Sequence, residues 1–311
     1  MFFSRRRRSA AESESEPPPN VRVPVRPAAG AAALRAPSPL HAFNRYELKY
    51  LVPEDRVPEV RERLTARMDS DANAQRGGYA VLSLYYDTDW LRFYWEKIEG
   101  ERFRRKLRLR VYGDRSGVDD ETPVFLEIKQ RVNRVTQKRR VRIPYGAARR
   151  LCDEREMIPH EPGQAAFLEE VLALVVENDL RPIVTTSYQR EPFVGRDIDL
   201  GLRVTLDHRI RGRDRDFHLG ADSQNRFTVS PHLSVMEIKV NERAPYWITD
   251  MAAALELSIV RVSKYCQSVE AFGKAPRSVF HVPEEIDGND PTGHPSPART
   301  TGRHYEELPA R

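Results

Sequence analysis

The stretch KLRLRVYG, residues 106–113, places Arg108 and Arg110 two positions apart, between the apolar residues Leu107, Leu109 and Val111. Successive side chains of a β-strand point to opposite faces of its sheet, so this spacing predicts a strand with one cationic and one apolar face. The apolar face can pack against other parts of the protein. The cationic face needs water or an anion.

Other segments rich in β-branched and aromatic residues repeat this alternation and predict further strands. Helical periodicity is found in three stretches, so the fold class is α+β, with consecutive strands dominating and a few helices packed outside them. The eight predicted strands span residues 44–52, 79–88, 106–113, 124–131, 138–144, 183–193, 202–210 and 234–240, and the helical stretches span 53–68, 163–180 and 248–272.

Charged residues fill the same-face positions of five more of these strands. For any single strand, a solvated outer face is the simpler explanation. Six such strands, with few small polar residues at these positions, indicate that the charged faces converge inside a closed or nearly closed antiparallel barrel of eight strands. The residues concerned are Glu47 and Lys49, Glu127 and Lys129, Lys138, Arg140 and Arg142, Arg203 and Asp207, and Glu237 and Lys239.

A barrel interior lined by cations requires an anionic occupant, because unpaired buried charge is costly. Arginine offers paired donors to phosphate oxygens and lysine a compact charge, so the mixture favours a linear phosphate chain. The carboxylates suit Mg²⁺ or Mn²⁺, with Glu237 as the first choice of ligand. Glu47 and Glu127 are either further metal ligands or partners of the neighbouring Lys and Arg side chains.

The composition excludes several other classes of protein. The chain has 51 Lys and Arg against 46 Asp and Glu, so a basic site must come from the arrangement of charges and not from their sum. Cys152 and Cys266 are isolated, which argues against a disulfide framework or a zinc site. The chain contains no run of eighteen apolar residues, the length needed to cross a membrane, and we expect a cytoplasmic protein. The sequence contains no P-loop, no HExxH and no nucleophile elbow, and His208 is expected to be structural because Asp207 points to the other face.

The two ends of the chain differ from its middle. Residues 1–40 and 282–311 are rich in Pro, Ala, Ser, Gly and charged residues, and they predict a disordered arm and tail around a domain at 41–281. The run Arg5 to Arg8 is a weak indication of nucleic-acid binding, because few aromatic residues lie among the basic ones.

An ordered set of segments resembles the VTC domain of polyphosphate polymerases, a branch of the triphosphate-tunnel, or CYTH-like, superfamily. The resemblance covers most of residues 41–275. The segments are RYELKYLV, SLYYDT followed by FYWEKIEG, KLRLRVYG, VFLEIKQR, QKRRV, SYQREPF, LRVTLDHRI, VMEIKV and SKYCQSV.

This resemblance implies a metal-dependent polymerase in which a basic tunnel transfers the γ-phosphoryl group of ATP to a growing polyphosphate chain and releases ADP. It implies Mn²⁺ or Mg²⁺ on Glu237. The catalytic cations would be Lys49, Arg108, Arg110, Lys129, Arg203, Lys239 and Lys264, and further substrate contacts would come from Arg190, Tyr188 and Lys138 or Arg139.

The first strand departs from one branch of the superfamily. It carries Arg45, Glu47 and Lys49 where the hydrolytic triphosphatases and adenylate cyclases resemble E-x-E-x-K, and loss of the first carboxylate favours a polymerase. A triphosphatase and a non-catalytic polyphosphate-binding module remain alternatives.

Replacement of Lys239 or Arg108 by Ala is expected to abolish phosphate binding and leave the fold intact, because a repulsive cluster of cations is relieved.

Overall fold

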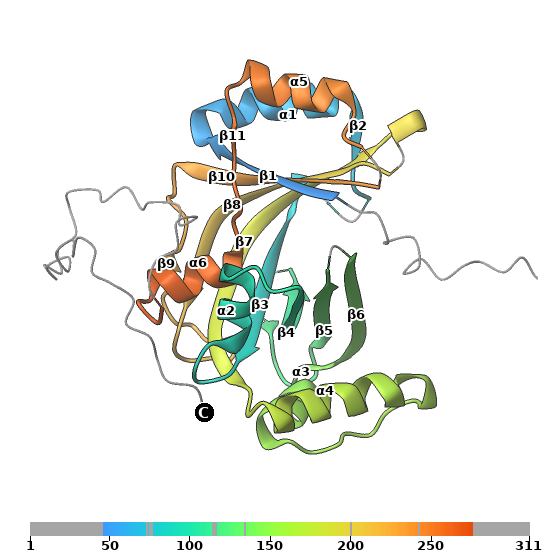
Figure 1. Cartoon of the computed structure of the whole chain (residues 1–311), viewed down its shortest axis with the longest axis vertical. Helices are drawn as coiled ribbons and strands as arrows, with labels where there is room; N and C mark the ends of the chain where they lie inside the picture. Colours follow the sequence, from blue (N-terminus) through green and yellow to red (C-terminus); the bar gives the residue numbers. More distant parts are fainter. Residues whose placement is uncertain are drawn as a thin grey trace, which may run out of the picture. The chain divides into compact units, whose positions relative to one another are not determined.

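A single antiparallel sheet forms the centre of the domain (Figure 1). The computed structural model describes residues 46–275 except 73, 75, 76, 114–116, 134, 200 and 242. The predicted arm at 1–40, the predicted tail at 282–311 and Arg45 lie outside the described residues. The limits of the domain at 41 and 281 therefore stay predictions.

The eight predicted strands are all present, and three strands of two or three residues join them to give an 11-stranded sheet in the described part of the chain. The main strands follow the order β11-β1-β10-β8-β7-β3-β4-β5-β6, while β2 pairs with β7 and β9 pairs with β8. Their bounds are β1 Tyr46–Pro53, β2 Met68–Ser70, β3 Tyr79–Asp87, β4 Phe103–Tyr112, β5 Pro123–Val132, β6 Val135–Pro144, β7 Arg181–Gly195, β8 Arg203–Arg213, β9 Arg226–Phe227, β10 Leu233–Val240 and β11 Ser258–Ile259.

The sheet is open, so the prediction of a closed eight-stranded barrel is wrong. Strands β6 and β11 form its two ends, and no backbone ladder joins them within the described residues. In the described residues, Lys129 of β5 reaches Glu47 of β1 across the opening, with its Nζ 3.6 Å from Glu47 Oε2. Closing a barrel requires the two edge strands to reach hydrogen-bonding distance, whereas here long side chains meet across the opening.

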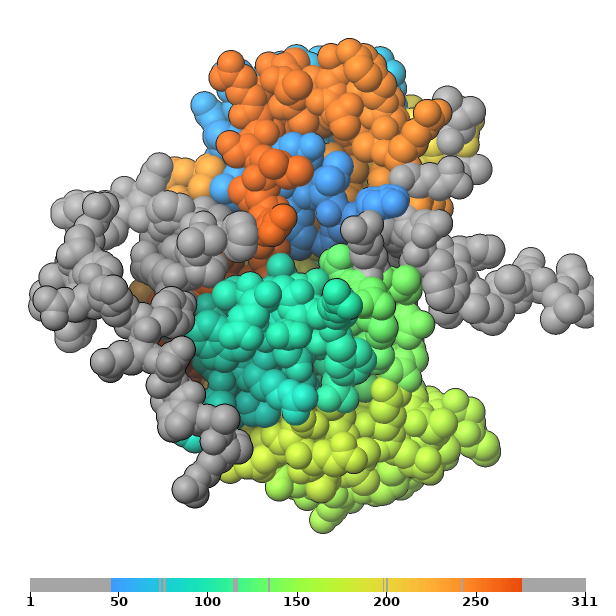
Figure 2. Space-filling view, viewed as in Figure 1, coloured from blue at the N-terminus to red at the C-terminus, as the bar shows by residue number. Residues whose placement is uncertain are grey.

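Helices cover the outer, apolar face of the sheet in two separate places. Near β1, β8 and β10, a cluster that includes Val60, Leu206 and Ile238 packs under α1 and α5, whose surface is shown in Figure 2. Near β3 to β6, a second cluster that includes Leu109 and Leu168 packs under α3, η5 and α4. The helical segments are η2 Glu54–Arg56, α1 Val57–Thr65, α2 Arg92–Ile98, α3 Tyr145–Arg149, the π-helical η5 Arg150–Glu154, η6 Pro162–Gln164, α4 Ala165–Glu177, η7 Asp197–Asp199, α5 Tyr246–Ala254 and α6 Lys264–Ala271.

The helix α6 lies on the inner face of the sheet, which corrects the prediction that all helices pack outside. Lys264 at its first turn contacts Asp207 of β8, and the ring of Tyr265 packs on Tyr85 of β3. Every residue from Lys264 to Glu270 is buried. The predicted helical stretch 248–272 is therefore two helices, α5 outside and α6 inside, with β11 between them (Figure 1).

Close packing of α6 against β8 requires a glycine at residue 212. A Cβ atom there would lie 2.6 Å from the backbone oxygen of Thr185 and 3.0 Å from Ser268 Oγ. We expect Gly212→Ala to lower the free energy of unfolding by about 1–3 kcal/mol, because a strand or the helix must shift. Urea denaturation measures this change. Gly163→Ala, whose new Cβ would meet nothing within 4 Å, is the control, and equal effects of the two would contradict this account.

His208 belongs to a polar network on the outer face, as the sequence predicts for a structural residue. Its Nε2 lies 2.9 Å from Glu191 Oε1, and its Nδ1 lies 2.6 Å from Ser234 Oγ and 3.5 Å from Glu54 Oε1. Arg61 donates two hydrogen bonds of 2.8 Å to Glu191. Burial disfavours the charged imidazolium, but Glu191 and Glu54 outweigh this effect and raise the pKa of His208 above its usual value.

The raised pKa predicts a pH-dependent contribution of His208 to stability. A group whose folded-state pKa is raised stabilises the fold fully below its unfolded pKa, about 6.5 for histidine, and this stabilisation is lost as the pH rises through the folded pKa. We expect His208→Gln to reduce the free energy of unfolding more at about pH 5.5 than at about pH 9. Urea titrations at both pH values test this, and an equal reduction at both would show that His208 acts only by packing.

Candidate functional site

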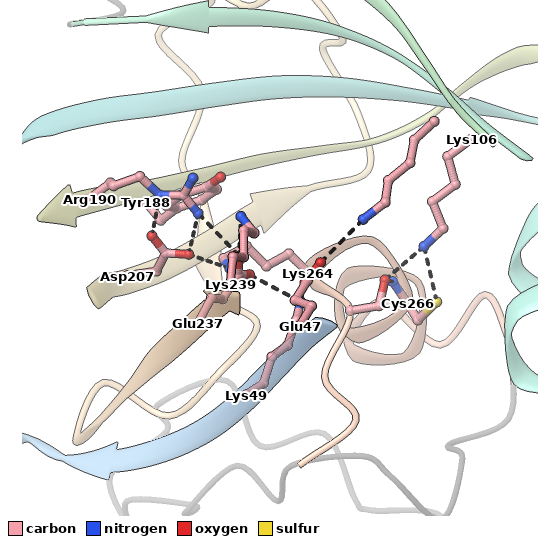
Figure 3. A network of polar contacts seen from close by, with 12 residues as sticks. Glu47, Lys49, Lys106, Tyr188, Arg190, Asp207, Glu237, Lys239, Lys264 and Cys266 are labelled. Carbon is pink, nitrogen blue, oxygen red and sulfur yellow. Dashed lines mark hydrogen bonds and ion pairs between the residues drawn. The ribbon is translucent and has the colours of Figure 1, made fainter. Parts of the chain in front are cut away.

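Glu237 on β10 is the centre of a buried charge cluster on the inner face of the sheet (Figure 3). Lys49 and Lys264 each place Nζ 3.0 Å from its Oε1. Lys239 Nζ and Arg190 lie 3.3 Å and 3.7 Å from its Oε2. Burial disfavours the charged carboxylate, but these four cations hold the pKa of Glu237 well below its usual range.

Asp207 is the second buried carboxylate of this cluster. Arg190 binds it through two hydrogen bonds of 2.6 and 2.7 Å, and Lys264 Nζ lies 2.5 Å from its Oδ2. Both cations also contact the ring of Tyr188, since Lys264 Nζ and the guanidinium of Arg190 lie 4.7 and 5.2 Å from its centroid. The pairing with Arg190 and Lys264 overcomes burial and lowers the pKa of Asp207.

Glu127 on β5 organises a second group of cations. Its side chain is 1% exposed, and Arg108 approaches its Oε2 at 2.6 Å while Lys138 lies 2.7 Å from its Oε1. Arg140 is farther away, at 3.8 Å. Burial favours the neutral acid, but Arg108, Arg110 and Lys138 lower the pKa of Glu127 to about 2. Arg108 also donates a 3.0 Å hydrogen bond to Tyr85.

Arg110 lies between the two groups and has no carboxylate within ion-pair distance among the described residues. It is 6% exposed and donates to Ser83 Oγ at 3.0 Å and to the Tyr188 hydroxyl at 3.4 Å. Arg110 is near enough to Glu127 to lower the pKa of that carboxyl, but its own hydrogen bonds go to neutral hydroxyls and not to a carboxylate. An anion bound beside Arg110 would therefore supply the missing ionic partner.

Lys129, which is exposed, and Lys239, which is half-buried, both lie near Glu47, and Lys239 is its partner in the β1–β10 register. Lys129 makes the 3.6 Å ion pair with Glu47 that spans the opening of the sheet, and Glu47 also contacts Lys49 at 3.0 Å. Burial, with Arg190 and Lys129 adding to it, outweighs Glu237 and Glu47 and lowers the pKa of Lys239 to about 8. The protonated form of Lys239 would thus gain from a bound anion.

Two predicted residues do not join these groups. Arg203 shares the inner face but pairs with Asp71, through a 2.6 Å hydrogen bond. Arg139 points to the outer face, where it pairs with Glu170 of α4, so of the two predicted alternatives Lys138 is the one that lies on the charged inner face. Arg139 lies between Lys138 and Arg140 along β6, so its side chain points to the face opposite theirs.

Lys106 is a residue of the site that the sequence analysis missed. Its Nζ donates to Ser263 Oγ at 2.8 Å and lies 4.9 Å from the ring centroid of Tyr265. The period-two pattern could have identified it, because Lys106 precedes Arg108 by two residues and continues the basic face of β4. Tyr85 was also missed. Burial raises its pKa, but Arg108, Arg110 and Lys106 outweigh burial and lower it to about 8.

The three carboxylates predicted as metal ligands do not form one site. Within the described part of the chain, no group of three His, Cys, Asp or Glu residues could hold a metal ion, and no cation bridges Glu127 to the other two. Glu47 and Glu237 do lie together, since both contact Lys49 Nζ at 3.0 Å. Mg²⁺ is commonly held by one or two carboxylates plus substrate phosphates, so these two residues fit a metal that arrives with a phosphate ligand.

The inner face has more cations than carboxylates. A flexible polyanion can contact many of these cations at once, which a small carboxylate ligand could not do. None of the helices in the described residues is long and apolar enough to cross a membrane. The inner-face cations include Lys49, Lys106, Arg108, Arg110, Lys129, Lys138, Arg140, Arg190, Lys239 and Lys264, and the carboxylates among them are Glu47, Glu127, Asp207 and Glu237.

Comparison with solved structures gives matches of low similarity. The PH1819 protein of Pyrococcus horikoshii OT3 aligns with a TM-score of 0.37 and 11% identity, over 73% of this chain and 99% of that chain. A proposed adenylate cyclase from Bacillus halodurans aligns with a TM-score of 0.42 and 14% identity, over 71% and 95%. The description of the fold therefore rests on this structure alone.

Sequence comparison is more informative. Subunit 4 of the vacuolar transporter chaperone complex is 25% identical in Trypanosoma brucei brucei, over 282 residues, and 26% identical in Trypanosoma cruzi, over 281 residues. Each match covers 75% of this chain and 35% of the relative, so the chain spans about a third of these relatives' length. The VTC domain family matches residues 44–272, which contain every residue of the site. The chain therefore belongs to the VTC domain family.

Proposed function

We propose that the domain is a polyphosphate polymerase that transfers the γ-phosphoryl group of ATP to the end of an inorganic polyphosphate chain. The observation that carries this proposal is the set of inner-face cations on β6, β5, β4, β7, β10 and β1, with Arg110 lacking a carboxylate partner among the described residues. A set of this kind matches a linear phosphate polymer. The family membership and the charged inner face both support the proposal.

The chemistry requires no protein nucleophile. A terminal phosphate oxygen of the chain attacks the γ-phosphorus of ATP, the bond from that phosphorus to the bridging oxygen breaks, and ADP leaves with the electron pair. Lys49, Lys264 and Arg190 would hold the reacting phosphates in line and stabilise the charge on the oxygens. Catalysis by positioning and electrostatics is normal for phosphoryl transfer.

A divalent metal, Mn²⁺ or Mg²⁺, is part of this proposal. Glu237 and Glu47 would hold it together with phosphate oxygens, and it would neutralise charge on the transferring group. Lys49 lies between the two carboxylates, so its ammonium must move toward phosphate when the metal binds. A cytoplasmic location stays a prediction from the sequence.

The proposal is tested by incubating the purified protein with ATP and Mn²⁺ or Mg²⁺ and resolving the products on a polyphosphate gel. ADP and free phosphate are assayed in the same samples. A ladder of chains with ADP in matching amount is the expected result. Free phosphate without a ladder would mean a triphosphatase, and polyphosphate binding without turnover would mean a binding module; either outcome would overturn the polymerase.

A further inference from the structure

Three aromatic rings from neighbouring strands meet at one end of the charged face. Tyr112 of β4 lies edge to face with Tyr79 of β3, with centroids 5.6 Å apart and planes at 79°. It makes the same kind of contact with Phe125 of β5, at 5.7 Å and 76°. Tyr112 is thus the middle ring, and its neighbours hold it from two sides in the geometry that aromatic pairs prefer.

The rings share the inner face with the phosphate-binding candidates. Tyr112 follows Arg110 by two residues on β4, and Phe125 lies directly opposite Arg110 in the β4–β5 register. Tyr79 lies opposite Arg190 in the β3–β7 register. The guanidinium of Arg110 is 5.9 Å from the centroid of Tyr112, so the aromatic rings lie directly beside the inner-face cations.

Core packing does not account for Tyr112 and Phe125. Neither belongs to any of the apolar clusters found in the described residues, and Tyr112 is 37% exposed. One face of Phe125 is covered by the guanidinium of Arg140, 4.4 Å from its centroid. Tyr112 is therefore the ring with the accessible surface, and it lies beside Arg110, which has no carboxylate partner among the described residues.

We propose that Tyr112 binds the base of the nucleoside triphosphate by stacking, while the triphosphate runs inward along Arg110 toward Arg190 and Lys264. Tyr79 and Phe125 are positioning residues that fix the ring. This inference rests on the proposed function and names where its nucleotide sits. Stacking on an aromatic ring tolerates every base, so the site takes nucleoside triphosphates with little preference for the base.

The subsite separates nucleotides from inorganic phosphate chains, and this difference is the basis of the test. Isothermal titration calorimetry gives the Kd of ATP and of inorganic tripolyphosphate for the wild type and for Tyr112→Leu. We expect the Kd of ATP to rise between about 5-fold and about 100-fold, the range for loss of one base–aromatic stack. The Kd of tripolyphosphate should stay unchanged, because that ligand has no base.

Two further variants separate stacking from structural effects. Tyr112→Phe keeps the ring and should keep wild-type affinity for ATP. Phe103→Leu is the matched control, since Phe103 lies on the same strand with similar exposure, 43%, but alternates onto the other face, so its ATP affinity should not change. Thermal melts show whether each variant is folded.

The outcomes that overturn the inference differ from those that overturn the proposed function. If Tyr112→Leu binds ATP as well as the wild type does, the base lies elsewhere and the polymerase proposal is unaffected. If it loses ATP and tripolyphosphate equally, the ring only supports Arg110 and is no base site.

Discussion

Glu237→Gln should reduce phosphoryl transfer by about a hundredfold to a thousandfold, the scale observed when one preorganised electrostatic group is removed from an active site. It should also lower the free energy of unfolding by about 3 kcal/mol, because breaking a buried ion pair leaves uncompensated charge. Four cations depend on this carboxylate, which is 8% exposed: Lys49, Arg190, Lys239 and Lys264. ADP release and urea denaturation measure the two effects.

An added anion should compensate for the missing carboxylate of this variant. Inorganic tripolyphosphate is expected to raise the melting temperature of Glu237→Gln more than that of the wild type, because phosphate oxygens replace the lost partner of the cations. Glu170→Gln is the control, since Glu170 pairs with Arg139 on the outer face. Its loss should change neither the rate of ADP release nor the free energy of unfolding. A Glu237→Gln protein with wild-type rate and stability would show that Glu237 is not the centre of the site.

Arg108→Ala should destabilise the protein by about 3 kcal/mol, in contrast to the sequence-based expectation of an intact fold. That expectation assumed that a repulsive cation was being removed. The structure shows that Arg108 is instead the closest partner of Glu127, which is 1% exposed. Removing Arg108 leaves that carboxylate with only Lys138 and the more distant Arg140. The change is measured by urea denaturation.

The double variant Arg108→Leu with Glu127→Leu tests the cause of this loss. Replacing both members of a buried pair by apolar residues is often neutral or stabilising, so the double variant should recover most of the stability.

Lys239→Ala should keep wild-type stability, because the lowered pKa of Lys239 indicates that its charge is disfavoured in the fold. Equal losses for Arg108→Ala and Lys239→Ala would contradict the distinction between them.

Period-two spacing was enough to predict which face of each strand carries charge. Lys49 pairs across the ladder with Glu237, and Arg108 with Glu127, so residues that the sequence placed on one face are indeed neighbours. Which anion each cation contacts could not be predicted, because that depends on the register between strands far apart in the sequence. For this reason Arg108 was expected to be repelled by its neighbours when it is in fact paired.

The position of α6 could not be predicted from periodicity either. A helix with apolar and polar faces is normally read as an outer helix, yet α6 is buried on all sides because Lys264, Gln267 and Glu270 are included in the interior. Only the partners Asp207 and Glu237 make a buried lysine acceptable there. Those partners come from β8 and β10, and no local pattern reveals them.

The opening between the two ends of the sheet determines how a long polymer can reach the site. A closed ring admits a chain only by its end, whereas a wall interrupted at one seam can also admit a segment from the side. In the described residues the seam is spanned by the side chains of Lys129 and Glu47, which are 44% and 30% exposed. Such a pair is weakened by salt, so lateral loading of polyphosphate should become easier as ionic strength rises, even as each phosphate contact weakens.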